Sequence, residues 1–444
     1  MILELIGDMV RNVGVAGLPT LKRAAGKVTP LIPIPTPLLL VGPGSAARLG
    51  QAIADFGHRK LLLVTDSEIT RLGLMAPLTE ALAAAGTDYA VFDAVTADAP
   101  IPLIERGLAE FVSKKCDAIV AFGGGSVMDA AKVIALAAAN HKAPRALAGY
   151  FRGWHGPAPI YAVPTTAGTG SEVTVAAIIS DPKRGKKYMV ADTRIVPAMA
   201  ALDPTLMVGL PPAVTAATGM DALTHAVEAY ISGWATPFTD RMALAAAGMI
   251  WQHLPRAFAD GADLVAREKM ALASTFAGLA FTRANVGNVH AIAHQLGGKY
   301  HTPHGLANAI LLPPVLRFSL PECTPRLARL ADRVGIKARG DKALASKFID
   351  AVQALNDRLE IPRSLAALQE NDIAALAKAA CWEADANYPV PRQMSKKDCE
   401  GLLRMVLPVT AAAAPRKKPM RQAGKGTLTA QKSSRAARKP RPAS

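Results

Sequence analysis

The sequence predicts an α/β domain built on a parallel sheet, followed by an all-helical domain. Between residue 38 and about residue 205, apolar runs of four to eight residues alternate with helical patterns, and Gly or Asp bounds the runs. This alternation is typical of a parallel sheet whose strands are buried on both faces. After Pro211–Pro212 the chain is rich in Ala and Leu with helical periodicity, which predicts helices alone.

The elements follow this pattern in order. Four prolines between residues 30 and 37 favour an extended approach to the first domain. Residues 1–24 can form an amphipathic helix, for which packing on that domain or on a neighbouring subunit is favoured over a membrane anchor. Apolar runs predict strands at 60–66, 89–95, 116–125 and 159–166. Helical patterns predict helices at 74–85, 101–114 and 126–140. We therefore divide the chain into an N-terminal extension (1–37), an α/β domain (38–208), a helical domain (209–412) and a disordered basic tail (413–444).

The composition excludes several classes of protein. The chain has 444 residues and is 50% hydrophobic, which is incompatible with disorder throughout. Its four cysteines are far apart and form no CxxC motif, so a disulfide scaffold is excluded and a reducing, cytoplasmic location is expected. The N-terminus carries Glu4 and Asp8 in place of the basic residues of a signal peptide, and no apolar stretch is long enough to span a membrane.

The high net charge of +16 belongs mostly to the tail. Residues 415–444 contain ten Lys or Arg and no Asp or Glu, which leaves +6 for the other 414 residues. The tail has no aromatic residue on which bases could stack. It can support nonspecific electrostatic adhesion, and we expect no specific nucleic-acid partner.

A glycine-rich turn follows the third predicted strand. Gly123-Gly124-Gly125-Ser126 joins this strand to a helix. Glycines allow the backbone to approach a pyrophosphate, and the free N–H groups of the helix N-terminus favour an anion. The motif is not GxGxxG, and taken alone it is equally consistent with a tight turn.

A second glycine-rich element, TTAGTGSE, follows the next strand. Its hydroxyls, including Thr165 and Thr166, can surround the nicotinamide side of the same cofactor. Two such loops predict a Rossmann-like, dinucleotide-binding domain. Asp66 ends the first strand, where a carboxylate can bind the adenine-ribose hydroxyls and disfavour a 2′-phosphate, so NAD is favoured over NADP. Asp66 is equally consistent with a plain helix N-cap.

The helical half carries the sharpest signal. Asp221 and His225 in GMDALTHAVEAY stand four residues apart, as do His290 and His294 in NVHAIAHQLGG, and His304 follows in the turn HTPHG. Residues i and i+4 share one helix face, so each pair can point at one centre. One carboxylate with three imidazoles suits Fe(II), Zn(II), Co(II) or Ni(II) and differs from a thiolate structural zinc site.

These motifs together resemble one family. GGGSVMDAAK, PTTAGTGSEVT, GMDALTHAVEAY and HAIAHQLGGKYHTPHGLANAILLP are similar, in this order, to those of the iron-containing (group III) alcohol dehydrogenases. The resemblance covers about residues 38–410. It implies a dinucleotide-binding domain, a helical domain and an active site between them.

The resemblance also implies roles for individual residues. The metal ligands of the family fall on Asp221, His225, His290 and His304, and its non-ligand active-site histidine falls on His294, the predicted catalytic residue. The cofactor residues fall on Asp66, Gly124, Gly125, Ser126, Asp129, Thr165, Thr166 and Lys187. His301 is not at a ligand position of the family.

One departure concerns the cofactor. The usual Pro-Asn-Pro after the second strand is replaced by Asp98-Ala99-Pro100, so an Asn contact to the cofactor is missing or rebuilt. The resemblance says nothing about the basic tail or the first 37 residues.

The function expected from these features is an NAD(H)- and metal-dependent alcohol dehydrogenase, an oxidoreductase acting on CH–OH groups. Fe(II) is the favoured metal, with Zn(II) as the alternative, and the partners are a small alcohol or aldehyde and further copies of the chain in a homo-oligomer. Related alternatives are lactaldehyde, hydroxybutyrate and maleylacetate reductases, the last disfavoured by the intact metal ligands. A lyase of the dehydroquinate-synthase type is disfavoured because residues 290–304 contain no Arg cluster.

Overall fold

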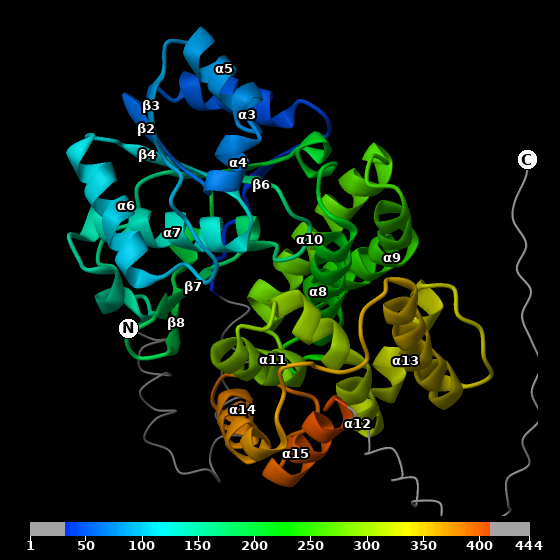
Figure 1. The fold of residues 1–444 in the computed structure, drawn as a ribbon. Coiled ribbons are helices and arrows are strands. Elements are labelled where there is room, and N and C mark those ends of the chain that lie inside the picture. Colours follow the sequence, from blue (N-terminus) through cyan, green and yellow to red (C-terminus); the bar gives the residue numbers. More distant parts are fainter. Residues whose placement is uncertain (1–31, 409–444) are drawn as a thin grey trace, which may run out of the picture. The chain divides into compact units, whose positions relative to one another are not determined.

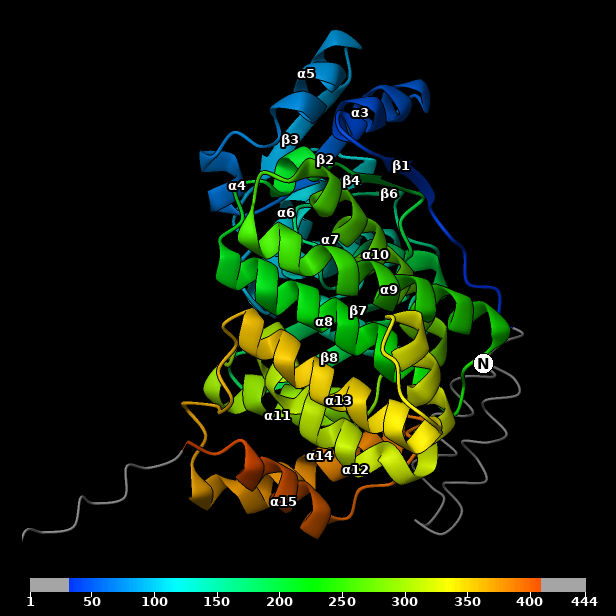
Figure 2. The same cartoon turned by 90° about the vertical axis from the view of Figure 1, so that its right-hand side faces the viewer.

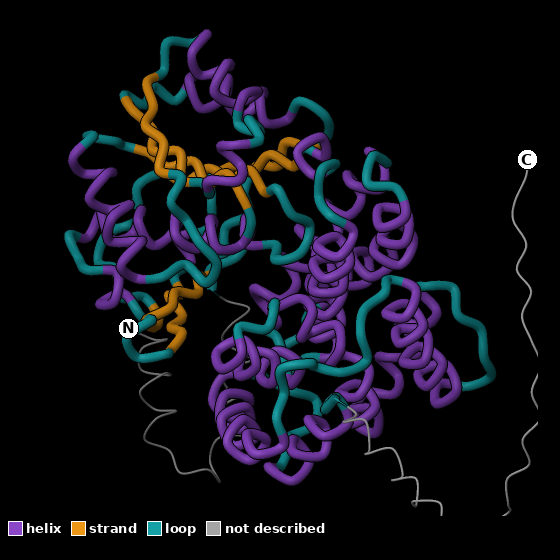
Figure 3. Tube along the Cα trace, in the orientation of Figure 1, coloured by secondary structure: helices purple, strands orange, loops and turns teal. Residues whose placement is uncertain are grey.

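A computed structural model of the chain describes residues 32–408. The predicted N-terminal helix (1–24) and basic tail (413–444) lie outside the described residues. Within them, the strands gather in one part of the molecule and the other part is made of helices (Figure 3).

The central sheet has six strands, all parallel, in the order β1-β9-β6-β4-β2-β3 (Figure 1). The middle strand β4 reads AIVAFG and is buried along its whole length, as expected of a strand covered on both faces. The prediction of a parallel sheet is confirmed. Its strands are β1 (Leu38–Val41), β2 (Lys60–Val64), β3 (Asp88–Phe92), β4 (Ala118–Gly123), β6 (Ile160–Pro164) and β9 (Met199–Leu202).

Helices cover both faces of this sheet (Figures 1 and 2). Side chains alternate between the faces, so that Leu61 and Leu63 of β2 pack with α3 and α5, whereas Leu62 and Val64 pack with α6 and α7. These helices, with the short α4, are α3 (Ser45–Asp55), α4 (Ser67–Arg71), α5 (Ala76–Ala84), α6 (Ile101–Ser113) and α7 (Gly125–Asn140). The predicted helices at 74–85, 101–114 and 126–140 correspond to α5, α6 and α7.

A second, three-stranded sheet was not predicted. It consists of β5 (Gly149–Tyr150), β8 (Lys186–Ala191) and β7 (Ala176–Asp181) in that order, with β7 and β8 antiparallel. Strands β1 and β9 and helix α3 were also not predicted from the sequence. The small sheet matters for the site because β8 carries Lys187.

The rest of the described chain, after β9, contains helices and no strand, which confirms the predicted all-helical half. Helices α8, α9 and α10 pack side by side (Figure 2), and α10 also contacts β9 and the segment Ser171–Val173 of the first half. The helices are α8 (Pro212–Ile231), α9 (Pro237–Ala259), α10 (Leu264–Ala284), α11 (Asn288–Tyr300), α12 (His304–Arg333), α13 (Asp341–Arg358), α14 (Ile373–Asn387) and α15 (Lys396–Met405).

Small side chains allow these helices to approach closely. A Cβ added to Gly219 of α8 would lie 2.3 Å from Leu254 Cδ1 of α9.

Between residues 32 and 408, no helix is both long and apolar enough to cross a membrane. The division of the chain into independent domains near residue 208 stays a prediction.

Candidate functional site

The predicted metal-binding side chains come from three helices of the helical half. Asp221 and His225 lie one turn apart on α8, and His290 and His294 lie one turn apart on α11. His304 is the first residue of α12, directly after Pro303. The helical spacing places each pair on one face, as the sequence predicts.

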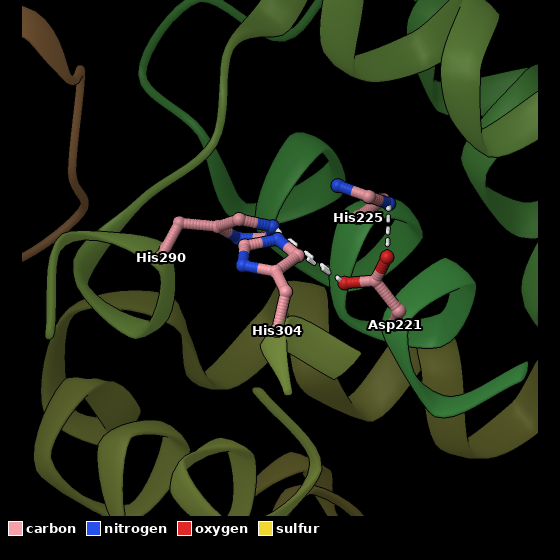
Figure 4. Close-up of side chains that lie close together, drawn as sticks. All are labelled: Asp221, His225, His290 and His304. Atoms are coloured by element: carbon pink, nitrogen blue, oxygen red, sulfur yellow. Dashed lines mark ion pairs between the residues drawn. The ribbon is translucent and has the colours of Figure 1, made fainter. Parts of the chain in front are cut away.

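Four of these side chains meet at one point (Figure 4). The ligand atoms of Asp221, His225, His290 and His304 all lie within 4.8 Å of one another. Asp221 Oδ1 lies 3.6 Å from His304 Nε2 and 4.0 Å from His290 Nε2. Residues far apart in sequence thus form one cluster of a carboxylate and three imidazoles.

The cluster keeps its imidazoles neutral. Burial, with three neighbouring histidines, lowers the pKa of His290 well below its usual value. Burial also lowers the pKa of His225, although Asp221 and a hydrogen bond with the Gly168 backbone act in the opposite direction. A neutral imidazole is the form that binds a metal ion, so the electrostatics fit a metal site.

One buried polar atom of the cluster also fits a cation. Among the described residues, His225 Nδ1 is buried and has no hydrogen-bond partner. A buried acceptor without a partner is costly, and a bound metal ion would satisfy the His225 lone pair. The donor set of three nitrogens and a carboxylate therefore fits a divalent transition metal.

Glu228 is a part of this site that we did not predict from the sequence. His290 Nδ1 lies 2.6 Å from Glu228 Oε2, and the carboxylate also accepts hydrogen bonds from the backbone N–H groups of Gly287 and Val289. This contact keeps the proton of His290 on Nδ1 and leaves Nε2 to face Asp221. The signal was present, because Glu228 follows Asp221 by seven residues and so lies on the same face of α8.

Asn308 was likewise not predicted. It is fully buried one turn after His304 on α12, and its Nδ2 donates to Asp221 Oδ1 at 2.7 Å. The same nitrogen lies 3.1 Å from Nε2 of both His290 and His304. Asn308 therefore holds the carboxylate and the two ring nitrogens near one point.

His294 stands beside the four-residue cluster. Its Nδ1 lies 2.6 Å from Glu383 Oε1, which also accepts a hydrogen bond from the Tyr388 hydroxyl, and its ring stacks on that of His304. Burial alone would lower the pKa of His294, but the Glu383 carboxylate outweighs it and raises the pKa. His301 is the exposed C-cap of α11 and is not one of the four clustered residues.

The first glycine-rich turn lies where the sequence predicts it, between β4 and α7. Gly124 is the N-cap of α7 and no side chain caps this helix, so its first N–H groups remain available to an anion. A Cβ on Gly125 would lie 2.8 Å from Thr169 Cγ2, and one on Gly124 would lie 3.5 Å from Thr166 Oγ1. The two glycine-rich loops therefore lie against each other.

The second loop connects the sheet to the helices of the metal cluster. It starts at Thr165, whose N–H donates to the Gly123 carbonyl. A Cβ on Gly168 would lie 2.7 Å from Thr218 Cβ of α8, and one on Gly170 would lie 2.7 Å from the Ser274 carbonyl of α10. This close packing places the predicted cofactor loops next to α8, the helix that carries Asp221 and His225.

Asp66 and Asp129 have structural partners. Asp66 is the N-cap of α4, and its Oδ1 accepts hydrogen bonds from the N–H groups of Glu68 and Ile69. Asp129 uses both carboxylate oxygens to accept hydrogen bonds from Ser171 Oγ and the Ile178 N–H. For Asp66 the N-cap is established, whereas contacts of either residue with a cofactor stay predictions.

Lys187 and Ser126 both interact with Asp98, in the segment that departs from the family pattern. Lys187 Nζ lies 2.5 Å from Asp98 Oδ1, and the Asp98 N–H donates to Ser126 Oγ at 3.2 Å. Ala99 is buried with a positive φ of 41°. Asp98 thus contacts both Ser126 and Lys187, two of the predicted cofactor residues.

Comparison with known proteins identifies the family of this chain. Residues 35–204 match the family model for iron-containing alcohol dehydrogenases, and residues 215–407 match the model for the C-terminal part of the Fe-containing alcohol dehydrogenase family. The chain is 38% identical to the NAD-dependent methanol dehydrogenase of Bacillus methanolicus over 84% of this chain and 98% of that protein. It is 40% identical to the 1,3-propanediol dehydrogenase of Klebsiella pneumoniae over 82% of this chain and 95% of that protein.

Solved structures show the same likeness. A 1,3-propanediol oxidoreductase superimposes with a TM-score of 0.82 at 39% identity, covering 84% of this chain and 99% of that one. An alcohol dehydrogenase from Oenococcus oeni gives a TM-score of 0.81 at 34% identity with the same coverage. The chain belongs to the iron-containing alcohol dehydrogenase family, which confirms the resemblance, and it is an oxidoreductase of the alcohol dehydrogenase class.

Proposed function

We propose that this enzyme is an NAD(H)-dependent and metal-dependent alcohol dehydrogenase that interconverts a small primary alcohol and its aldehyde. The main supporting observation is the cluster of Asp221, His225, His290 and His304, two of which lie on α8, the helix that packs against the second glycine-rich loop. Relatives named as NAD-dependent methanol dehydrogenase and 1,3-propanediol dehydrogenase support both the cofactor and the substrate class.

The residues of the chain divide the work between them. The metal supplies Lewis acidity toward the alcohol oxygen, and NAD supplies the hydride acceptor. Asp221 and the three clustered histidines hold the metal, and the N–H groups at Gly124, Gly125 and Ser126 bind the pyrophosphate. Thr165, Thr166 and Lys187 orient the nicotinamide half of the cofactor, while Asp129 braces the 171–178 segment behind them.

His294 is the proposed proton-transfer residue. Glu383 holds one ring proton at Nδ1, which leaves Nε2 free to take the alcohol proton and pass it to solvent. The ring stacks on His304, one of the proposed ligands, so it stands close to the reacting alcohol. Transfer of the alcohol proton would require such an acceptor close to the residues that would hold the metal.

A chelation experiment tests this function. Protein purified without oxygen should contain one metal equivalent and reduce NAD⁺ with a small primary alcohol. Removal of the metal should abolish turnover, and Fe(II), the proposed native metal, should restore it better than Zn(II). Because Zn(II) binds such sites more tightly, protein purified in air can carry the wrong metal. Full activity in metal-free protein would contradict the metal-dependent mechanism.

Asp66→Ala tests the choice of cofactor. Loss of the carboxylate removes both a hydrogen-bond acceptor for the ribose hydroxyls and a repulsive charge against a 2′-phosphate. We expect the preference for NAD over NADP, measured as the ratio of kcat/KM values, to fall by about tenfold, which corresponds to about 1.4 kcal/mol. Asp66→Asn removes the charge but keeps an oxygen that can cap α4, so it controls for an effect of Asp66→Ala that comes only from unfolding of this helix. An unchanged ratio in both variants would refute the ribose role.

The substrate within this class, a homo-oligomeric state and a cytoplasmic location stay predictions. The intact ligand cluster favours a metal-dependent dehydrogenase over maleylacetate reductase.

A further inference from the structure

The segment Asp98–Pro100 is held in an unusual backbone conformation beside the proposed pyrophosphate loop. Asp98 and Ala99 are consecutive non-glycine residues with positive φ values of 66° and 41°. Such conformations cost energy and persist when surrounding contacts hold them. Here the Asp98 N–H donates to Ser126 Oγ, and the Ala99 carbonyl accepts a hydrogen bond from the Ser180 N–H of β7.

This conformation places a carboxylate between two groups of the proposed cofactor site. The backbone of Asp98 contacts Ser126 in the first turn of α7, while its side chain forms an ion pair of 2.5 Å with Lys187 Nζ on β8. The two charged side chains are 37% and 30% exposed, so solvent screens the pair only partly. Asp98 is also a position at which the sequence departs from the family motif.

The negative charge of Asp98 disfavours the binding of an anion, which the N-terminus of α7 and Lys187 both favour. The N-terminus of α7 has no side-chain cap and attracts an anion, and the ammonium of Lys187 adds positive charge on the same side. A carboxylate that engages this ammonium cancels its charge and occupies the hydrogen-bonding group that a dinucleotide would use. A cofactor that binds at this turn would therefore compete with Asp98 for the Lys187 ammonium.

We propose that Asp98 is an affinity-determining residue that restrains Lys187 and weakens the binding of the dinucleotide cofactor. This inference rests on the proposed function, since it takes the loop at Gly124–Ser126 as the pyrophosphate site. Weaker binding accelerates release of the reduced cofactor, and product release limits turnover in many well-evolved enzymes. Asp98 thus lowers the affinity for the cofactor and raises the turnover rate.

A double-mutant cycle on the holoenzyme tests the proposal, with the dissociation constant of NADH measured by fluorescence titration. Asp98→Asn should tighten NADH binding about five- to tenfold, because Lys187 is then free to contact the cofactor. Lys187→Met should weaken binding. In the Lys187→Met background, Asp98→Asn should change the dissociation constant by no more than about twofold, because its effect acts through Lys187.

The matched control is Asp357→Asn. Asp357 forms a comparable surface ion pair with Arg363 in the helical half, and the same change there should leave NADH binding unaltered. Asp98→Asn should also lower kcat at saturating NAD⁺, because NADH is released more slowly. A variant that had merely lost stability could show a lower kcat, but it would not bind NADH more tightly. Weaker NADH binding in Asp98→Asn would overturn the proposal, because Asp98 would then itself bind the cofactor.

The outcomes separate this inference from the proposed function. Wild-type protein that fails to bind NADH would contradict the proposed function. Wild-type protein that binds NADH, together with an Asp98→Asn variant of unchanged affinity, would contradict only the role of Asp98. An equal effect of Asp98→Asn with and without Lys187 would show that the carboxylate acts on the cofactor directly, which would also overturn the proposal.

Discussion

His290→Ala is expected to lose both bound metal and turnover. His290 lies at the centre of the site, because its Nε2 faces Asp221 and Asn308 while its Nδ1 contacts Glu228. Removal of this ring takes one of four proposed ligands and leaves the buried carboxylate of Glu228 with only its two backbone hydrogen bonds. Metal catalysis contributes several kcal/mol, so we expect kcat/KM to fall about a thousandfold or more. Metal content per chain and turnover are measured together.

His253→Ala is the matched control for this prediction. His253 is also buried and helical, but it lies on α9 and is not one of the four clustered residues. Its replacement should retain the metal, with any cost confined to thermal stability. Circular dichroism of both variants checks that the helical half is folded. If His290→Ala kept a full metal equivalent and wild-type activity, the assignment of the metal site would be wrong.

Much of the fold follows from the periodicity of the sequence. Within 60–66 and 116–125, the segments 61–64 and 118–123 are unbroken apolar runs because strands β2 and β4 are buried there on both faces, which is also why these strands were predicted. The small sheet was not predicted, since β7 and β8 are partly exposed and their pattern carries less apolar signal. Strand β1 follows the prolines that favour an extended chain. Its pairing was not predictable from local sequence, because its partner β9 lies about 160 positions away.

The candidate site was only partly predictable, for a physical reason. Spacing predicts that Asp221 shares a helix face with His225, and that His290 shares one with His294. It does not show which residue supports another across helices. Glu383, which contacts His294, lies 89 residues away on α14, and no local pattern connects the two. Glu228 differs from Glu383, because its spacing from Asp221 predicts a shared helix face. Its role as a partner of His290 was not predictable from that spacing.

Glu228→Gln is expected to weaken metal binding without removing any ligand. The carboxylate accepts hydrogen bonds from His290 and from the N–H groups of Gly287 and Val289. An amide has one acceptor oxygen in place of two, so it cannot accept from Val289, which contacts Oε1, and also from Gly287 and His290, which contact Oε2. The amide NH₂ must then face one of these donors. An uncharged amide oxygen is also a weaker acceptor for the His290 Nδ1–H than a carboxylate, so it orients the imidazole less firmly and leaves it a less basic ligand.

Loss of such a supporting contact typically costs about 10- to 100-fold in metal affinity, and we expect an effect of this size in competition titrations of the Glu228→Gln variant. Glu172→Gln provides the matched control, because Glu172 is equally buried but accepts its hydrogen bond from Thr275 and not from a proposed ligand. Equal losses of metal affinity in the two variants would indicate a general effect of neutralising a buried carboxylate. A loss confined to Glu228→Gln would show that the proposed ligand His290 is supported from α8, the same helix that supplies Asp221 and His225.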